Sequence, residues 1–463
     1  MKKYFVFIAT AILLFAFFSC KETSSYDNYT WDGTNYTDAD SDGIPDVAEA
    51  DGTSFYDMPL YDWGARPGIP DLFVHVAPMV AGADPDYPTY PDGGMLLQKK
   101  ALDRVVAAFA AQGIALHFDV GKSRLYEGYN EITDRGTSTY NLSGKDHSVS
   151  YNKSIALYNY SGTDSSFTFV NTLKPQYLPS DRYQIFYFMV FGSSQEADGG
   201  SGSSGIAYLG GRDFLITLAN WGFGFGSSTV LSLTYDNFEN YVVNKQASTI
   251  MHEFGHNLGL KHGGNENLNY KPNYYSIMNY LYQMSGLPRI GASEGDRYYY
   301  ERYYESEGAD PWKSLLDTQY SAAQIAYYGG SLYEVDLKDS AYSSTYKMDY
   351  SHGEGGQLDE ASLVESDGLK QSGSTSVNWN GTGSDTETVQ VNINPSYVNY
   401  DSGSAVVDII DDDKFNDHND WGNLYVYYND HHAGVSRTLE DPNREIIREY
   451  DAPRNMIPFQ RSK

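Results

Sequence analysis

QASTIMHEFGHNLGLKH, residues 246–262, is the stretch that decides the fold. Residues four apart on an α-helix share a face, so His252 and His256 can present two imidazoles to one metal ion. Glu253 projects beside them, where it can hold a water molecule near that ion. A different stripe of the same helix is apolar and predicts the face that is buried against the core: Ile250, Phe254 and Leu258.

The helix is expected to stop at Gly259, because a residue without Cβ readily adopts the left-handed turn that ends a helix. This turn swings His262 back towards the other two histidines. Three neutral imidazoles leave a fourth position open, as in catalytic rather than structural zinc sites. Zinc lowers the pKa of a bound water, and Glu253 is placed to take its proton. Two alternatives remain: core histidines without metal, and a decayed site that keeps zinc without catalysis.

The full spacing HExxHxxGxxH resembles the extended motif of the metzincin zinc endopeptidases. The resemblance implies an α+β catalytic domain with a mixed twisted sheet, a backing helix, an active-site helix, and a methionine turn in a C-terminal subdomain. The stretch YSIMNY, residues 275–280, resembles that turn, which would place Met278 as an apolar floor beneath the histidines. Its Ser-x-Met-x-Tyr form is similar to that of astacins and serralysins. This similarity implies Tyr280 as a fifth zinc ligand or a donor to the oxyanion; a buried core tyrosine is the alternative.

The residues after the third histidine depart from the well-known subfamilies, which carry an acidic residue, serine or proline there. Here Gly263 and Gly264 follow. The chain looks closer to acidic bacterial metzincin-like proteins with calcium repeats, in which a Gly-Gly pair precedes a Lys-Pro-Asn-Tyr stretch like residues 271–274. The departure affects substrate preference and not the reaction.

The elements around the motif follow an order typical of this family. Strands are expected at 71–76, 114–120 and 184–191, with an amphipathic helix at 99–112 after the first of them. A further strand over the cleft is expected to form a sheet edge that pairs with an extended substrate, or else an ordinary hairpin edge: Gly205, Ile206, Ala207, Tyr208 and Leu209. Residues 122–180 form a polar insertion.

The chain begins with a short basic segment, an almost wholly apolar run at 4–18, and Cys20. This pattern resembles a bacterial lipoprotein signal, in which 1–19 is removed and Cys20 carries the lipid. The resemblance implies an outer-membrane lipoprotein that faces the periplasm or the cell surface. A plain signal peptide with Cys20 as a bystander is the alternative.

Residues 38–49 match the twelve-residue calcium loop at every informative position. Gly43 allows the sharp turn at position six, and Pro45 resembles thrombospondin type 3 repeats. The expected ligands include the carbonyl of Ile44 at position seven: Asp38, Asp40, Asp42, Ile44, Asp46 and Glu49. A solvated acidic linker is the alternative. A second acidic cluster is either another calcium site or a solvated loop. The solvated loop is favoured, because the spacing of the carboxylates matches no calcium-loop template: Asp411, Asp412, Asp413, Asp417 and Asp420.

The composition excludes several classes of protein. Of the 463 residues, 41% are hydrophobic, which is enough for a sizeable core. The formal net charge of −29 argues against a nucleic-acid partner, which needs a basic face. The single cysteine excludes an intramolecular disulfide and a zinc site built from several thiolates.

These observations predict four segments: a signal peptide at 1–19, a lipid tether with a calcium loop at 20–65, a metzincin-like protease domain with insertions at 66–435, and a C-terminal tail at 436–463. The predicted protein is a monomeric zinc endopeptidase that cuts extracellular proteins or peptides with a zinc-activated water and Glu253 as general base. The alternative is a surface-anchored, zinc-containing binding or adhesin module without catalysis.

Overall fold

The computed structural model describes residues 27–29, 37–80, 93–128, 131–135, 137–158, 167–200, 202–219, 221, 223, 235–287, 290, 341, 343–380, 385–391, 393, 398–399, 406–407, 414–424 and 446–448. The predicted signal peptide, Cys20 and residues 411–413 therefore lie outside the described residues. Among the described residues, no helix combines the length and apolar character needed to cross a membrane.

A mixed six-stranded sheet forms the centre of the molecule, in the order β18-β10-β11-β9-β3-β4. Strands β4 (Ala115–Asp119), β3 (Asp71–Pro78), β9 (Phe186–Gly192) and β11 (Asp213–Thr217) run parallel. Strand β10 (Gly205–Tyr208) is antiparallel to β11 and to β18 (Ile446–Arg448). Every residue of β3 and β9 is buried, as expected for parallel strands covered on both faces.

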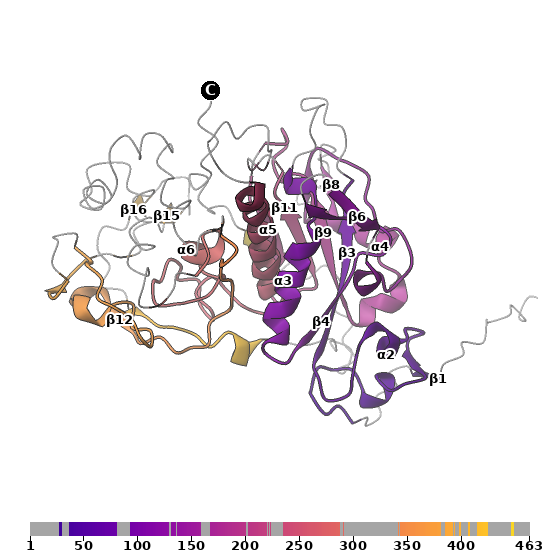
Figure 1. Cartoon of the computed structure of the whole chain (residues 1–463), viewed down its shortest axis with the longest axis horizontal. Helices are drawn as coiled ribbons and strands as arrows, with labels where there is room; N and C mark the ends of the chain where they lie inside the picture. Colours follow the sequence, from indigo (N-terminus) through magenta and orange to yellow (C-terminus); the bar gives the residue numbers. More distant parts are fainter. Residues whose placement is uncertain are drawn as a thin grey trace, which may run out of the picture.

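Two helices pack side by side on one face of this sheet (Figure 1): α3 (Lys99–Ala110) and α5 (Tyr235–Asn257). Helix α3 connects β3 to β4, and α5 carries the histidine motif. Phe254 joins the layers, because its ring centroid lies 5.6 Å from that of Phe109 on α3, 5.0 Å from Tyr187 on β9 and 5.7 Å from Phe214 on β11. The predicted buried stripe of α5 is confirmed.

The predicted strands and backing helix are confirmed with small shifts of their ends, but the predicted edge strand differs in two ways. Leu209 lies in the turn after β10 and is not part of the strand. The outer side of β10 is also not free, because β18 pairs with it, with Ala207 opposite Ile447. Strand β11 was not predicted from the sequence, and it separates β10 from β9.

The segment 20–65 is predicted to be a lipid tether with a calcium loop, yet residues 44–65 of it pack against the hydrophobic core of the central sheet. Strand β2 (Thr53–Phe55) pairs in parallel with β1 (Asp27–Tyr29), and α2 (Leu60–Trp63) follows. The apolar side chains of this segment are buried in the main hydrophobic cluster, which explains the difference from the prediction: Ile44, Ala48, Phe55, Met58 and Leu60.

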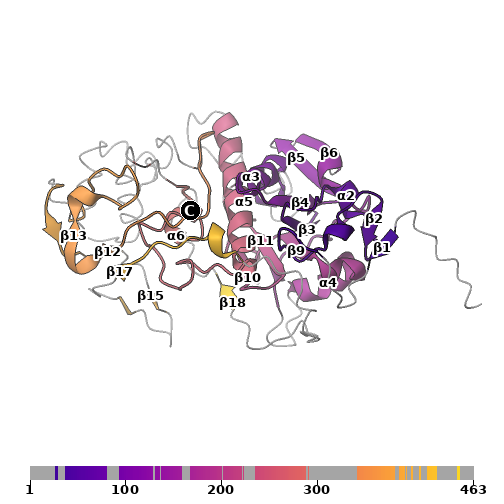
Figure 2. The same cartoon turned by 90° about the horizontal axis from the view of Figure 1, so that it is seen from below.

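Helix α5 separates this N-terminal part from a second group of elements, called here the second lobe, which Figure 2 shows on the other side of the helix. There α6 (Tyr280–Gln283) lies near two small antiparallel pairs around a cluster that contains Trp379. These pairs are β12 (Leu358–Asp359) with β17 (Lys414–Phe415) and β13 (Leu363–Val364) with β14 (Thr388–Val389). The remaining elements are β5 (Arg124–Gly128), β6 (Glu131–Arg135), β7 (Ile155–Ala156), β8 (Thr168–Phe169), α4 (Val170–Tyr177), β15 (Val398–Asn399) and β16 (Val406–Val407).

Candidate metal centre

The three motif histidines converge on one buried point. One ring nitrogen from each of His252, His256 and His262 lies within 4.8 Å of the other two. The Nε2 atoms of His252 and His256 are 3.1 Å apart. His252 and His256 are wholly buried and His262 is 9% exposed. The helical spacing and the turn at Gly259 therefore bring together the residues that the sequence predicted.

Backbone carbonyls orient two of these imidazoles. The Nδ1 atom of His252 lies 2.6 Å from the carbonyl oxygen of Ile277, and that of His256 lies 2.7 Å from the carbonyl of Leu260. A carbonyl can only accept, so each Nδ1 carries the hydrogen and each Nε2 directs its lone pair to the shared point. Such hydrogen bonds are typical of histidines that bind metal.

The third imidazole supplies the test of whether a metal fits. Nε2 of His262 is buried and has no hydrogen-bond partner among the described residues. Burial, followed by the nearby rings of His256 and His252, holds the pKa of His262 well below its usual range. The side chain is therefore a neutral donor, and three neutral nitrogen donors suit zinc.

The end of α5 follows the sequence prediction. Gly259 has a φ of 92°, and its amide donates to the carbonyl of His256 at 3.0 Å. The amide of Leu260 donates to the carbonyl of Gly255 at 2.9 Å. This left-handed helix end reverses the chain and lets His262 face the motif helix.

Glu253 lies where α5 meets β10. Its side chain is buried, and a Cβ atom built on Gly205 would collide with its carboxylate. The first residue of β10 must therefore lack a side chain for Glu253 to keep this position. A chain that pairs with β10 near Gly205 would therefore pass close to the Glu253 carboxylate.

Met278 and Tyr280 both lie beside the histidines. Met278 is buried in the turn 276–279, and its sulfur occupies the space where Gly255 lacks a Cβ. The ring centroid of Tyr280 lies 4.2 Å from that of His262 and 6.0 Å from that of His252. Met278 therefore contacts the motif helix at Gly255, and the Tyr280 ring lies beside the rings of His262 and His252.

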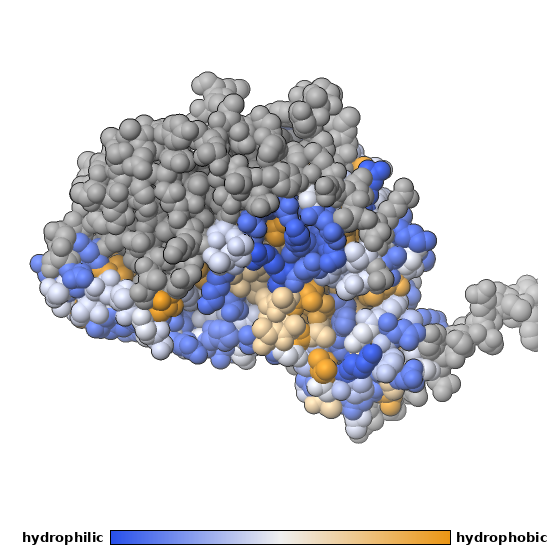
Figure 3. Space-filling view, viewed as in Figure 1, coloured by the Kyte–Doolittle hydropathy of each residue, from blue (hydrophilic) through white to orange (hydrophobic). Residues whose placement is uncertain are grey.

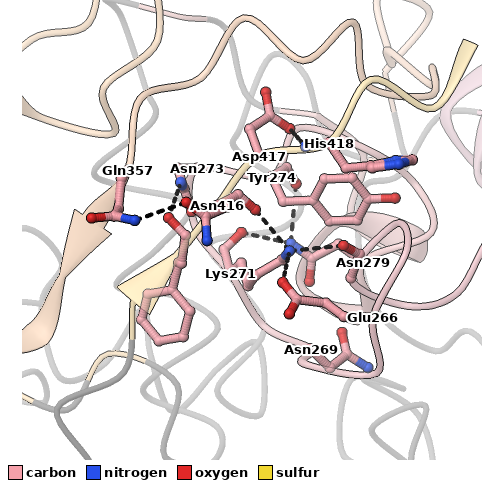
Figure 4. Close-up of polar contacts among 12 residues, drawn as sticks. Glu266, Asn269, Lys271, Asn273, Tyr274, Asn279, Gln357, Asn416, Asp417 and His418 are labelled. Carbon is pink, nitrogen blue, oxygen red and sulfur yellow. Dashed lines mark hydrogen bonds and ion pairs between the residues drawn. The ribbon is translucent and has the colours of Figure 1, made fainter. Parts of the chain in front are cut away.

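Lys271 supports the loop of the third histidine, although the sequence alone did not mark it as a site residue. It is wholly buried, and its Nζ donates to the carbonyl of Gly263, to Glu266 and to the carbonyl of Asn416, at 2.8, 2.9 and 2.8 Å (Figure 4). Burial lowers the pKa of its ammonium group, and Glu266 opposes that shift. Its only sequence signal is position: a lysine shortly after Gly263 and Gly264.

Asn279 completes the support of this segment. Its side-chain amide donates to the carbonyls of Lys271 and Tyr274, at 2.7 and 3.1 Å, and its side-chain oxygen accepts from the amide of Leu281. One asparagine therefore joins the turn that holds Met278 to the segment that holds Lys271.

The described part of the second acidic cluster is structural. Asp420 is buried and accepts hydrogen bonds from the hydroxyl of Tyr274, the amide of Ser351 and Nδ1 of His418. Asp417 accepts from the hydroxyl of Ser351 and the amide of Gly355. The two carboxylates thus join segments of the second lobe and are not the solvated loop that the sequence favoured.

The predicted calcium-loop residues lie together against β3. Ligand oxygens of Asp38, Asp40 and Asp42 lie within 4.8 Å of one another, and so do those of Asp42, Glu49 and Asp71. Burial raises the pKa of Asp42 to about 8. Burial and the neighbouring carboxylates, Asp42 first, also raise the pKa of Glu49. Asp46 accepts a hydrogen bond from the amide of Ala39, inside the loop, at 2.9 Å.

The comparison with protein families agrees with this geometry. Residues 140–263 match the model described as Metallo-peptidase family M12B Reprolysin-like, and this range includes Glu253 and all three histidines. The chain thus contains a region similar to a reprolysin-like metallopeptidase domain, and together with the histidine triad this supports a zinc metalloprotease. No curated protein and no solved structure is significantly similar to the chain.

Proposed function

We propose that this protein is a zinc endopeptidase of the metzincin type, with Glu253 as its general base. The observation that carries the proposal is the convergence of three histidine nitrogens, two of them on imidazoles oriented by backbone carbonyls, in the buried region that also holds Glu253. The match of residues 140–263 to a metallopeptidase model supports the same reaction class. His252, His256 and His262 would hold the zinc.

The zinc would polarise the scissile carbonyl and make an attacking water more acidic. Glu253 accepts the proton of this water and delivers it to the leaving amine, which is the role of a general base that then acts as an acid. Tyr280, whose ring centroid lies 4.2 Å from that of His262, is proposed to donate a hydrogen bond to the oxyanion. Met278 acts as the metzincin methionine floor and keeps the histidines in place.

The substrate is proposed to lie extended beside β10, as a strand added to the sheet. The position of Gly205 against Glu253 supports this path, because a chain along β10 would reach the general base. In the structure β18 holds that side of β10. Productive binding along this path therefore requires β18 to leave the strand.

Cleavage of a diverse peptide pool, read by mass spectrometry, tests the proposal. The parent protein with one equivalent of zinc is compared with Glu253→Gln, and the exposed Glu354→Ala serves as the matched control. Cuts made by the parent and by Glu354→Ala, but not by Glu253→Gln, support the proposal. If these three proteins and a parent chain that ends at residue 445, without β18, all bind zinc and none cuts any peptide, the binding-module alternative replaces it.

We also propose that the protein is an exported, monomeric lipoprotein of an outer membrane, attached through Cys20, and that residues 38–49 bind calcium. The described surface fits attachment by the lipid alone: it is mostly hydrophilic in the view of Figure 3. Ile69 and Val80 are its exposed large hydrophobic residues in the described segments. Mass spectrometry of the N-terminal peptide tests this attachment, and an unmodified Cys20 would contradict it.

A further inference from the structure

The acidic loop lies against a carboxylate that its own motif does not contain. Asp71 is the first residue of β3 and is wholly buried. One of its carboxylate oxygens lies within 4.8 Å of ligand oxygens of Asp42 and Glu49. The main chain makes the same junction, because the amide of Asp71 donates to Oδ2 of Asp42 at 2.7 Å. Three acidic groups from two distant parts of the sequence thus meet in one buried place.

Glu49 has no lysine or arginine partner in the described segments. Its side chain is wholly buried, and neither carboxylate oxygen accepts a hydrogen bond from an N–H or hydroxyl group of the described residues; its close polar neighbour is the carboxyl group of Asp71. Burial of an ionised carboxylate without a partner is strongly unfavourable, so such groups are normally paired or coordinate a metal. Within the described segments, no lysine or arginine forms an ion pair with Asp40, Asp42 or Glu49.

The hydrogen bonds to Asp71 orient its carboxylate and leave lone pairs of its oxygens available to a cation. Oδ2 of Asp71 accepts from the amide of Arg66 at 3.1 Å, and Nε2 of His117 contacts Oδ1. The side chain of Arg66 points away, since its Nη1 donates to the carbonyls of Tyr61 and Ala65. Carboxylate oxygens have further lone pairs, so Asp71 can still coordinate a cation while it accepts these hydrogen bonds.

We propose that Asp71 is a calcium ligand from outside the loop, and that the bound ion fastens the N-terminal segment to the central strand β3. The inference rests on the proposed calcium loop and adds to it both a ligand and a role. Ca²⁺ takes six to eight oxygen ligands, which the carboxylates of Asp38, Asp40, Asp42 and Glu49 together with Asp71 can begin to supply. The ion acts as a structural clamp on the catalytic core, and the segment is not a flexible tether.

Calcium titration of the full chain tests the proposal in a Glu253→Gln background, which prevents self-digestion. The proteins are first dialysed against EGTA and then supplied with zinc again. Isothermal titration calorimetry measures their calcium affinity, and thermal unfolding measures the Tm with and without CaCl₂. Asp71→Asn keeps the acceptor for Arg66 or His117 but weakens coordination. Glu49→Gln is the second variant, and the exposed Asp51→Asn is the matched control.

Calcium is expected to raise the Tm of the parent and of Asp51→Asn by about 3 °C or more. In Asp71→Asn and Glu49→Gln, calcium affinity is expected to fall about tenfold or more, while the metal-free variants are at least as stable as the metal-free parent. Calcium should also slow hydrogen–deuterium exchange at the backbone amide of Asp71 in the parent.

The proposal would be overturned if Asp71→Asn bound calcium as tightly as the parent and were less stable than the parent both with and without calcium. Asp71 would then be a purely structural residue. A parent that binds no calcium overturns the loop as well. Because neither readout measures peptide cleavage, these outcomes are independent of whether the zinc site hydrolyses peptides.

Discussion

The buried ammonium group of Lys271 donates a hydrogen bond to the carbonyl oxygen of Gly263, the residue directly after His262, at 2.8 Å. The same nitrogen donates to the carbonyl of Asn416, the residue directly after β17. One side chain thus connects the loop of the third histidine to the second lobe of the molecule. The position of His262 depends on that lobe as well as on the motif.

Replacement of Lys271 by methionine should therefore weaken both folding and zinc binding. The variant leaves the carbonyls of Gly263 and Asn416 and the carboxylate of Glu266 without their donor, which should lower the free energy of unfolding by about 2 to 4 kcal/mol. Zinc affinity should fall about tenfold or more, because groups that orient metal ligands contribute at this scale. Chelator competition measures the zinc affinity.

The exposed Lys347→Met is the control for this prediction and should change neither quantity. Unchanged zinc affinity in a destabilised Lys271→Met would mean that Lys271 supports the fold without positioning His262.

The contact between Gly255 and Met278 predicts a coupled pair. Gly255→Ala places a methyl group against the sulfur of Met278 and should be destabilising by about 1 to 3 kcal/mol. Met278→Ala should cost about 2 to 5 kcal/mol through the cavity it leaves, and Met278→Leu less than about 1.5 kcal/mol. The double variant Gly255→Ala/Met278→Ala should lose less free energy of unfolding than the two single variants lose together. Urea unfolding of the four proteins measures this coupling, and strict additivity would refute the contact.

The local features of the site could be predicted from sequence because they depend on neighbours in the chain. The spacing of His252, His256 and His262 on a helix and a glycine turn is a property of backbone geometry. The buried face of α5 follows in the same way from a period of 3.6 residues.

The missed features depend on contacts between distant segments. Lys271 reads as an ordinary surface lysine until Asn416 is brought beside it, and Asp71 reads as the start of a strand until the acidic loop folds against it. The pairing of β18 with β10 joins residues more than 200 positions apart in the chain, with Ala207 opposite Ile447, and a three-residue strand carries little periodicity. No local pattern encodes such pairings.

The close approach of Gly205 to Glu253 predicts a change in catalysis without loss of metal. In Gly205→Ala the new methyl group must displace the carboxylate, because β10 is held by its neighbours on both sides. We expect kcat to fall about tenfold to a hundredfold, the scale at which misplaced catalytic groups act. Zinc content, measured by mass spectrometry of the metal, should stay at one per chain. Parental kcat in this variant would argue against Glu253 as the general base.

The position of β18 predicts that a shorter chain is the better peptidase. A chain that ends at residue 445 lacks β18 and exposes the outer side of β10, so the KM for extended peptides should fall several-fold, since no internal strand competes. A chain that ends at residue 448 keeps β18 and is the matched control. Equal KM values in these two chains would show that substrate does not use this side of β10.

A buried pair of histidines predicts how stability depends on pH. His75 and His147 stack with ring centroids 3.9 Å apart, and Arg182 donates to Nδ1 of His75 at 3.1 Å. Burial, followed by the charges of His147 and Arg182, lowers the pKa of His75 well below its usual range. Burial also lowers the pKa of His147, against the opposing effect of Asp119. Arg182 pairs with Asp119, so a positive charge already occupies the centre of this cluster.

Both histidines therefore stay neutral in the folded protein at pH values where the unfolded chain, with a histidine pKa near 6.5, binds protons. The free energy of unfolding should fall as the pH drops below about 6.5, by roughly 1 kcal/mol per histidine for each pH unit. His75→Gln keeps an acceptor for Arg182 and removes one titrating group, so its unfolding free energy should fall less steeply between about pH 6.5 and 5. The exposed His352→Gln should follow the parent, and urea unfolding across this range compares the three. Parallel curves for His75→Gln and the parent would show that folding does not lower the pKa of His75.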